Sequence, residues 1–510
     1  MSNQLADFFN SIHSKEPEIK VFSKKKLSSS TEEKLLGYQI EPTIRMVDIA
    51  TNKKIVINGS DTGTGKTYMV AAACKELERR PLIICPKSVM YTWVSVCEYM
   101  DIEAFDIVNF ETIKNGKTYK MGTDDKGNPK YTFRNRKDAE YLETEVDENG
   151  KRTYIWLLPK DVIVVVDEAH RSKNVSSENG RFLKSLRRVM ERGRPVVLIS
   201  ATLCEKIKDM KLIMYLLGKI DDTPEYNKYM DALDEKYPEL KVRKRDYKRE
   251  PKKYQNAKED ADAKKIHMEI KDFSCRVKIK DLGDRFPSNQ WYAQLFIAEE
   301  TDKIVEAYDE LAEHMRQLKE NNDTSVLGKI VKLKQEIELR KIPIFVEEAK
   351  QLLEEGNSVI IFVNYLETLR TIADELNIVC RVYGGNEEYG KQTLEEREEA
   401  IRLFQSNERR IIICQIKSGS VGISLHDLHG DYPRRTLINL PDTASDIIQA
   451  MGRAPRAGAK SAVIQKIVLV ANVPFEEKAK RNIDRRMKNV STINDNDIDL
   501  YKYRVVKKRN

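Results

Sequence analysis

The chain has 510 residues, with 89 lysines and arginines against 81 aspartates and glutamates, so its formal net charge is +8. Hydrophobic residues make up 40% of the sequence and charged residues 33%, which is typical of a soluble globular protein and excludes a fibrous or disordered one. The length suits about three domains. The small basic excess allows nucleic acid as a partner but does not require it.

Cysteine usage and hydropathy limit the compartment. The seven cysteines are scattered, with no C-x-x-C pair, so we expect neither a disulfide framework nor a structural zinc site. This cysteine usage favours a reducing compartment. No apolar run approaches the roughly 18 residues of a membrane span, and the first residues contain no signal-peptide core. We expect a soluble intracellular protein without a membrane partner, in the cytoplasm, the nucleus or a viral replication site.

The first part of the chain alternates short apolar runs with amphipathic segments such as 66–79. Continuous β-branched runs are typical of strands buried on both faces of a parallel sheet. An insertion over about 113–160 contains Asn149-Gly150 between alternating flanks, which predicts a β-hairpin, and a second turn at 126–129. The strands of this first region are expected at 53–59, 81–86, 161–168 and 195–202.

The middle of the chain is polar and rich in lysine. Residues 241–253 contain eight basic and two acidic side chains, for which a solvated surface and a nucleic-acid contact carry equal weight. Over 301–342 the apolar spacing predicts a helical hairpin whose apolar stripe serves packing. Strands of a second α/β region are expected at 357–364, 378–383, 409–415, 434–440 and 462–470, so the sequence predicts two doubly wound domains.

A glycine-containing loop follows the first predicted strand, in the order Gly59-Ser60-Asp61-Thr62-Gly63-Thr64-Gly65-Lys66-Thr67. Glycines let the backbone wrap a polyphosphate, so that amide groups and the helix N-terminus face its charge. The Lys66 ammonium would reach the β- and γ-phosphates, and the Thr67 hydroxyl would hold Mg²⁺. The strict pattern has glycine where this chain has Ser60.

Two carboxylates follow the predicted strand over 161–168. They begin the run Asp167-Glu168-Ala169-His170, at the strand end where doubly wound sheets bind ligands. Asp167 can bind the Mg²⁺ that bridges the phosphates, and Glu168 can orient and deprotonate the attacking water. His170 is expected to link this site to neighbouring segments.

Together these segments resemble the helicase motifs of superfamily 2. SDTGTGKT, DEAHRSKN and LISATL are similar to motifs I, II and III, and QAMGRAPRAG is similar to motif VI. ICPKSVMYTW (84–93) and the RSKN extension resemble the SNF2-like branch. ELRKIPIFVEEAKQLLEEGNSVIIFVNY (338–365) resembles annealing helicases, and SGSVGISLHDLHGDYPRRTLINLP (418–441) resembles helicases of large DNA viruses. The resemblance covers about residues 31–475.

The resemblance implies two RecA-like lobes with ATP in the cleft between them. We expect a tail over 1–30, lobe 1 over 31–215, a basic helical connector over 216–340, lobe 2 over 341–475 and a basic extension over 476–510. In the first lobe the resemblance assigns adenine recognition to Gln39 and coupling between the lobes to His170, Ser200 and Thr202. In the second lobe Gln449 matches the coupling glutamine, Gly422 lies near the nucleotide, and Arg453 and Arg456 act as fingers on the γ-phosphate.

The family also implies contacts with the phosphate backbone, which carry little sequence information. The matching residues are Pro86, Lys87 and Ser88 of motif Ia, Asn364 and Tyr365 of motif IV, and Ser418, Gly419 and Ser420 of motif V.

The expected function is therefore that of a monomeric, ATP- and Mg²⁺-dependent translocase on duplex or branched DNA, with protein partners that the sequence does not identify. The first alternative is an RNA helicase, because Asp-Glu-Ala-His also occurs in RNA-acting families. The second is a helicase-like subunit of a transcription or repair complex with weak catalysis, which the intact Lys66, Asp167, Glu168, Arg453 and Arg456 disfavour.

Overall fold

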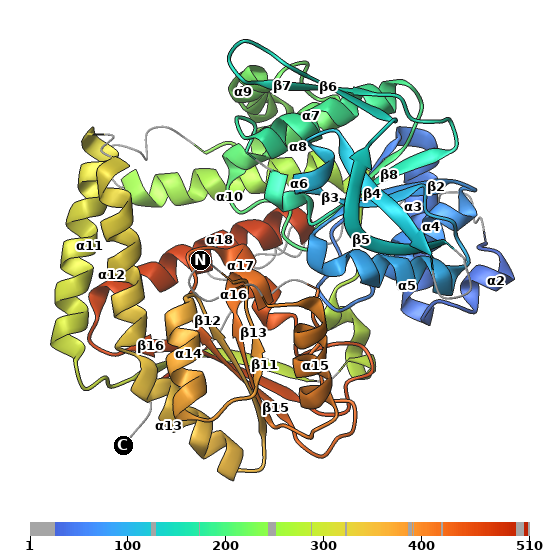
Figure 1. Cartoon of the computed structure of the whole chain (residues 1–510). Coiled ribbons are helices and arrows are strands. Elements are labelled where there is room, and N and C mark those ends of the chain that lie inside the picture. Colours follow the sequence, from blue (N-terminus) through green and yellow to red (C-terminus); the bar gives the residue numbers. More distant parts are fainter. Residues whose placement is uncertain are drawn as a thin grey trace, which may run out of the picture.

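The computed structural model describes residues 26–123, 129–172, 174–242, 251–286, 288–321, 324–385, 390, 392–419, 422–495 and 504–507. These residues form two parallel sheets, covered by helices on both faces, and two small antiparallel hairpins (Figure 1). The expected fold class is confirmed. The tail expected over 1–30 lies almost entirely outside the described residues, as does most of the basic run 241–253.

The first sheet, which organises lobe 1, has six parallel strands in the order β10-β1-β9-β8-β2-β3. Its central strands consist of β-branched and leucine residues that are almost fully buried, as expected for strands covered on both faces. The strands predicted at 53–59, 81–86, 161–168 and 195–202 are all present. The bounds are β1 (Ile55–Asn58), β2 (Arg80–Cys85), β3 (Asp106–Asn109), β8 (Val162–Asp167), β9 (Val196–Ile199) and β10 (Ser274–Cys275).

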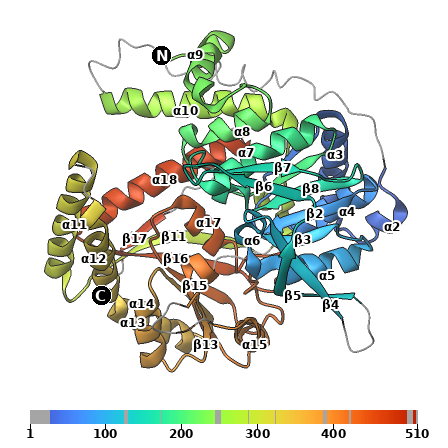
Figure 2. The same cartoon turned by 45° about the horizontal axis from the view of Figure 1, so that its top comes forward.

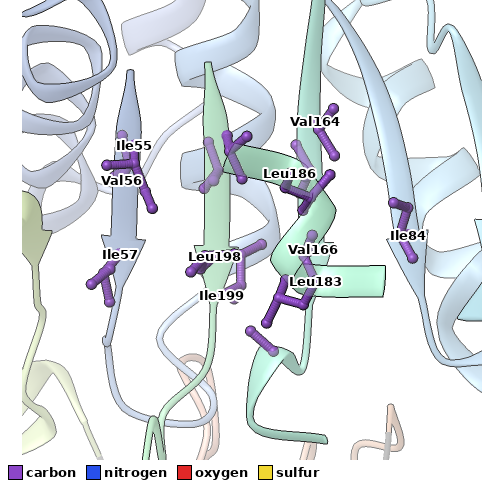
Figure 3. Close-up of a cluster of buried hydrophobic side chains, with 14 of the residues drawn as sticks. Ile55, Val56, Ile57, Ile84, Val164, Val166, Leu183, Leu186, Leu198 and Ile199 are labelled. Carbon is purple, nitrogen blue, oxygen red and sulfur yellow. The ribbon is translucent and has the colours of Figure 1, made fainter. Parts of the chain in front are cut away.

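Helices cover both faces of this sheet (Figures 1 and 2). Figure 3 shows side chains of the sheet packed against Leu183 and Leu186, which belong to the amphipathic helix α7. The helices of this part of the chain are α2 (Ser29–Glu32), α3 (Gly37–Lys53), α4 (Lys66–Glu76), α5 (Met90–Met100), α6 (Phe110–Ile113), α7 (Glu178–Glu191), α8 (Lys211–Leu216), α9 (Tyr226–Lys236) and α10 (Pro251–Ile270).

The insertion between β3 and β8 forms two antiparallel hairpins, whereas the sequence predicts one hairpin at Asn149-Gly150 and a second turn at 126–129. The first pairs β4 (Lys117–Thr123) with β5 (Pro129–Asp138), and the second pairs β6 (Leu142–Val146) with β7 (Arg152–Trp156). Asn149-Gly150 lies in the turn of the second hairpin, and Gly150 has a φ of 71°, as such a turn requires. The turn predicted at 126–129 lies mostly outside the described residues.

The second sheet organises lobe 2 and is also entirely parallel, in the order β13-β14-β12-β15-β16-β11-β17. The five strands expected from the sequence are present. β11 and β17 were not expected, and β11 lies in this sheet although the sequence places residues 216–340 in a connector. The bounds are β11 (Asn289–Phe296), β12 (Ser358–Val363), β13 (Cys380–Val382), β14 (Ile411–Gln415), β15 (Arg434–Asn439), β16 (Val463–Val470) and β17 (Arg504–Lys507).

The helical hairpin expected over 301–342 is formed by α11 (Thr301–Asn321) and α12 (Leu327–Leu339). Its apolar stripe packs into the core of lobe 2, with the exception of Met315, which is 52% exposed. No helix in the described part of the chain is both long enough and apolar enough to cross a bilayer. The remaining helices are α13 (Ile342–Glu354), α14 (Leu366–Glu375), α15 (Leu394–Gln405), α16 (Ile416–Gly419), α17 (Ala444–Met451) and α18 (Pro474–Asp495).

The helix α18 connects the lobes. It follows the last long strand of lobe 2 and runs towards lobe 1, where it lies beside α10 (Figures 1 and 2). The Asn489 amide donates to the Glu205 carbonyl at 3.1 Å, and the Asn494 amide donates to the Ala201 carbonyl at 3.1 Å. Because both acceptors lie just after β9, the end of α18 is attached to the segment that leads out of the first sheet.

The core of lobe 1 gives a simple stability prediction. Leu198 is fully buried in the middle of the sheet, whereas Leu327 at the start of α12 is 46% exposed. Leu198→Ala should lower the free energy of unfolding by about 2–5 kcal/mol, because it leaves a cavity, and Leu327→Ala should change it by less than about 0.5 kcal/mol. Urea unfolding followed by tryptophan fluorescence measures both, and equal effects would contradict this packing.

Candidate active site

The glycine-containing loop joins β1 to α4, as predicted, and carries Thr62, Gly63, Thr64, Gly65, Lys66 and Thr67. Gly63 and Gly65 have φ angles of 86° and 82°, which glycine adopts without steric cost. The Lys66 ammonium donates to the carbonyls of Ser60 at 2.9 Å and Asp61 at 3.1 Å. It is therefore held inside the loop, at the N-terminus of α4, where an anion is favoured.

The environment of Lys66 makes its ammonium group more acidic than usual. Burial lowers its pKa to about 8, although the carboxylates of Glu168, Asp167 and Asp61 act in the opposite direction. An ammonium this poorly solvated gains from a phosphate nearby.

Gln39 lies behind the loop. Its amide Nε2 donates to the Thr64 carbonyl at 2.9 Å, and its Oε1 accepts from the Leu36 amide at 2.9 Å. A Cβ atom on Gly65 would lie only 2.3 Å from that Nε2. Gln39 thus shapes the phosphate loop, and its adenine contact stays a prediction.

Asp167 and Glu168 lie at the carboxyl end of β8, opposite the loop. The Trp93 indole N–H donates to Asp167 Oδ2 at 3.0 Å, and the Glu168 amide donates to Oδ1 at 2.9 Å. These bonds fix the carboxylate that is expected to hold Mg²⁺. The motif Ia match includes Trp93 but assigns it no role. From sequence alone, a tryptophan on an amphipathic helix is expected to be a core residue.

The two neighbouring carboxylates are electrostatically different. Burial and the adjacent Glu168 raise the pKa of Asp167. Burial also acts to raise the pKa of Glu168, but the hydrogen bond with His170 and the positive charges of Lys66 and Arg453 outweigh it and lower that pKa. Glu168 also adopts a left-handed backbone with a φ of 53°, a conformation that costs about 1–3 kcal/mol and is concentrated at functional sites.

His170 joins three segments, as the sequence predicts for a linking residue. Its Nδ1 lies 3.0 Å from Ser200 Oγ and 3.2 Å from Glu168 Oε2, and its Nε2 lies 3.2 Å from the Gln449 amide nitrogen. That Gln449 amide also donates to Glu168 Oε2 at 3.3 Å. A second bridge between the lobes joins Thr202 Oγ1 to Ser445 Oγ at 2.8 Å.

Arg453 and Arg456 follow α17 and enter the cleft from lobe 2. Each donates to the Ile423 carbonyl, at 3.5 Å from Arg453 and 2.8 Å from Arg456. Both Nε atoms are buried and have no hydrogen-bond partner among the described residues. Burial lowers the pKa of both guanidinium groups, and the charge of Arg453 adds to the effect at Arg456. Buried donors without acceptors are costly, so this corner favours an anion.

The lobes touch at the phosphate loop itself. A Cβ atom on Gly63 would lie 2.9 Å from the Pro455 carbonyl, and one on Gly452 would lie 1.7 Å from Thr62 Oγ1. Both positions therefore need glycine for close approach. The two lobes are therefore in direct contact at this loop, and Arg456 of lobe 2 lies beside Gly63 of lobe 1.

Arg276 is a site residue that sequence reasoning missed. Its guanidinium donates to the Gly59 carbonyl and, at 2.8 Å, to Asp61 Oδ1, and its Nε lies 2.6 Å from Asp495 Oδ1 at the end of α18. It therefore ties the phosphate loop to the helix that connects the lobes. Nothing in the sequence around a lone arginine indicates a tertiary partner more than 200 residues away.

The expected backbone-binding residues of lobe 1 lie at the end of β2. Pro86 is buried, Lys87 is exposed and Ser88 is half-buried. Gly422 of motif V packs on this segment, since a Cβ atom on it would lie 2.2 Å from a Val89 methyl group. The structure thus brings motifs Ia and V together through Gly422 and Val89, and the expected position of Gly422 near the nucleotide stays a prediction.

Asn364 and Tyr365 lie at the end of β12, where the Asn364 side-chain amide and both backbone N–H groups already have hydrogen-bond acceptors. The Asn364 amide side chain donates to Glu338 Oε2 at 2.7 Å, and both backbone N–H groups donate to the same buried carboxylate. Burial raises the pKa of Glu338. Ser418 and Gly419 are in α16, and Ser420 lies outside the described residues. For all of these, nucleic-acid contact stays a prediction.

The residues present fit a magnesium ion shared with phosphates. The described part of the chain has no group of three or more histidine, cysteine, aspartate or glutamate side chains that could hold a metal. A phosphate-bound Mg²⁺ needs fewer protein ligands, since it keeps several waters and takes one or two carboxylates. Asp167 and Thr67, on either side of the cleft floor, would hold it, and it would neutralise developing charge on the phosphates.

Comparisons with known proteins agree with this arrangement. Residues 19–203 match the family model described as "Type III restriction enzyme, res subunit", and residues 341–458 match "Helicase conserved C-terminal domain". The chain is 47% identical over 499 residues to a protein of Acanthamoeba polyphaga mimivirus named "Putative ATP-dependent RNA helicase L364", covering 97% of this chain and 90% of the relative.

Two solved structures of S. cerevisiae Dbp5 bound to RNA and ADP BeF3, one with the substitution L327V, were also matched. The identity is 12% for both, the TM-scores are 0.45 and 0.44, and the matches cover 95% and 94% of this chain and 95% and 96% of the Dbp5 chains. The family models and the viral relative together settle the family: the chain belongs to the superfamily 2 helicases, ATP-dependent enzymes that act on nucleic acid.

Proposed function

We propose that this helicase moves along the phosphate backbone of nucleic acid by closing its two lobes on ATP and reopening them after hydrolysis. The observation that carries the proposal is the convergence of Gln449, Arg453 and Arg456 from lobe 2 on the loop and the Glu168 carboxylate of lobe 1. Such a site is complete only when the lobes meet, so nucleotide binding is linked to a change in their separation.

Each residue has a distinct role in this scheme. Lys66 and the loop amides hold the β- and γ-phosphates, Glu168 orients and deprotonates the attacking water, and Arg456 stabilises charge on the transferred phosphoryl group. Arg453 approaches the two carboxylates and positions the loop that carries Arg456. Through their contacts with Glu168, His170 and Gln449 transmit a change at this carboxylate to Ser200 of motif III and to lobe 2.

The next question is whether the enzyme acts on RNA or on DNA. The DNA expectation is supported by the SNF2-like motif Ia and the RSKN extension, whereas the name of the mimivirus relative supports RNA. A relative at 47% identity over nearly the whole chain is stronger support than short motif details, so RNA becomes the first candidate and duplex DNA the second.

Stimulation of ATP hydrolysis tests both the function and the polymer. Single-stranded RNA, duplex RNA, single-stranded DNA and duplex DNA are compared at one salt concentration. We expect stimulation by RNA, and loss of that stimulation in Glu168→Gln. Stimulation by duplex DNA alone would restore the DNA assignment, and full activity of Glu168→Gln would contradict the proposed site.

Arg456→Ala separates binding from turnover. Because Arg456 belongs to lobe 2 and the loop that holds the phosphates belongs to lobe 1, ATP affinity should change less than about tenfold while hydrolysis falls by about 10³-fold or more, as for other arginine fingers. Fluorescent-nucleotide titration and steady-state turnover measure the two effects. An equally severe loss of both would show that the residue binds the ground state.

The pKa of Lys66 makes nucleotide affinity depend on pH. The phosphates bind the ammonium form, so above the free-site pKa of about 8 binding requires uptake of a proton. The Kd for ATP should be constant near neutral pH and then rise up to about tenfold per pH unit. Lys66→Arg, which stays protonated over this range, is the control, and a flat profile in the parent would contradict the assignment.

A further inference from the structure

The two hairpins inserted into lobe 1 carry opposite charge. The described strands β4 and β5 have six basic side chains and one acidic one, whereas the hairpin formed by β6, its turn and β7 has four acidic and two basic ones. In the first hairpin the basic side chains are all exposed: Lys117, Lys120, Lys130, Arg134, Arg136 and Lys137. The functional residues assigned above include none of them.

Most of this positive charge has no ion-pair partner among the residues that the structure describes. Lys117 pairs with Asp138 at 2.6 Å, but the other five basic side chains form no ion pair with any residue in the described ranges. Like charges on one two-stranded ribbon repel each other. A surface that only needed solvation would mix both signs, as the second hairpin does.

A bulge distorts the basic ribbon where it joins the body of lobe 1. Tyr119 pairs with Arg136 and Met121 with Tyr131, so four residues of β5 face the single residue Lys120 of β4. Within the bulge Phe133 adopts a φ of 50°, which is rare for a bulky side chain. Bulges of this kind redirect side chains and bend the strand.

The strained Phe133 is held by an aromatic cluster. The centroid of its ring lies 5.0 Å from that of Tyr91, 5.5 Å from that of Tyr119 and 5.4 Å from that of Tyr131. The Tyr91 hydroxyl also donates a hydrogen bond to the Thr132 carbonyl at 3.2 Å. Tyr91 lies in the first turn of α5, within the motif Ia segment 84–93. The cluster therefore attaches the basic ribbon to the segment that begins with Pro86, Lys87 and Ser88.

The ribbon continues the surface that motifs Ia and V form between the lobes. Gly422 of lobe 2 packs on Val89, Tyr91 follows in the same segment, and Phe133 packs on Tyr91. Figure 2 shows β4 and β5 extending beyond the rest of lobe 1 beside α5, on the side away from α11 and α12. A phosphate backbone lying along motif Ia would leave the cleft next to this ribbon.

We propose that the β4–β5 hairpin is a second nucleic-acid contact, in which Lys120, Arg134 and Arg136 bind phosphates of the strand that the motor occupies. This inference rests on the proposed function, since it assigns a further surface to the same substrate. The contact is electrostatic and independent of base sequence, because neutralised phosphates release their counterions. An acidic protein partner is the competing occupant.

The test compares two triple variants of the full-length protein. Lys120→Gln/Arg134→Gln/Arg136→Gln removes three charges from the hairpin. Lys329→Gln/Lys332→Gln/Lys350→Gln removes three exposed charges from α12 and α13, on the other side of the molecule (Figure 1). Binding of a fluorescein-labelled single-stranded RNA and of a fluorescein-labelled duplex DNA is measured without ATP over a series of salt concentrations.

The hairpin variant should bind at least about tenfold more weakly at low salt. Its plot of log affinity against log salt should flatten by about 2 for a single strand or by nearly 3 for a duplex, since each phosphate contact contributes about 0.7 or 0.9. The α12–α13 variant should match the parent, and Arg134→Lys/Arg136→Lys should retain the parent slope because the charge is kept. ATPase activity without nucleic acid should be unchanged in all of them.

An unchanged slope in the hairpin variant, or equal losses in the two triple variants, would overturn this inference. A parent whose ATPase responds to no polymer would instead contradict the proposed function. The two failures are distinguishable, because the binding experiment contains no ATP and needs no turnover.

Discussion

Buried positive charge without matching acceptors is the constraint on which the cleft between the lobes depends. Lys66 from lobe 1 and Arg453 and Arg456 from lobe 2 converge there, burial lowers the pKa of all three, and two buried guanidinium nitrogens have no partner among the described residues. The carboxylates of Asp167 and Glu168 offset part of this charge. We propose that the negative charge of a bound polyphosphate offsets the remainder, so that the nucleotide stabilises the closed arrangement of the lobes.

The same constraint explains why the lobes are joined at more than one place. Gln449 reaches Glu168, Thr202 reaches Ser445, and α18 carries Asp495 to Arg276, which holds the phosphate loop. In the proposed cycle, loss of the γ-phosphate would remove the anion but leave these contacts. Movement of lobe 2 would then reach the loop through the Arg276 guanidinium as well as through the nucleotide.

Sequence patterns predicted what is local and not what depends on distant contacts. The strands β1, β8 and β9 and the loop residues Gly63 to Thr67 could be placed because burial on both faces and phosphate binding impose strict residue types. The positions of β11 and Arg276 could not, since an eight-residue mixed strand and a lone arginine have no such signature. Asn364 matched a motif, yet the structure engages it with the buried Glu338, a partner invisible in spacing.

The central claim is that one nucleotide is held by both lobes, and a crystal structure with a non-hydrolysable ATP analogue, Mg²⁺ and an oligonucleotide tests it most directly. We predict a γ-phosphate within about 3.2 Å of Lys66 Nζ and of a guanidinium nitrogen of Arg456. An analogue bound to the loop of lobe 1, with Arg453 and Arg456 both beyond hydrogen-bond reach while the oligonucleotide is bound, would contradict it.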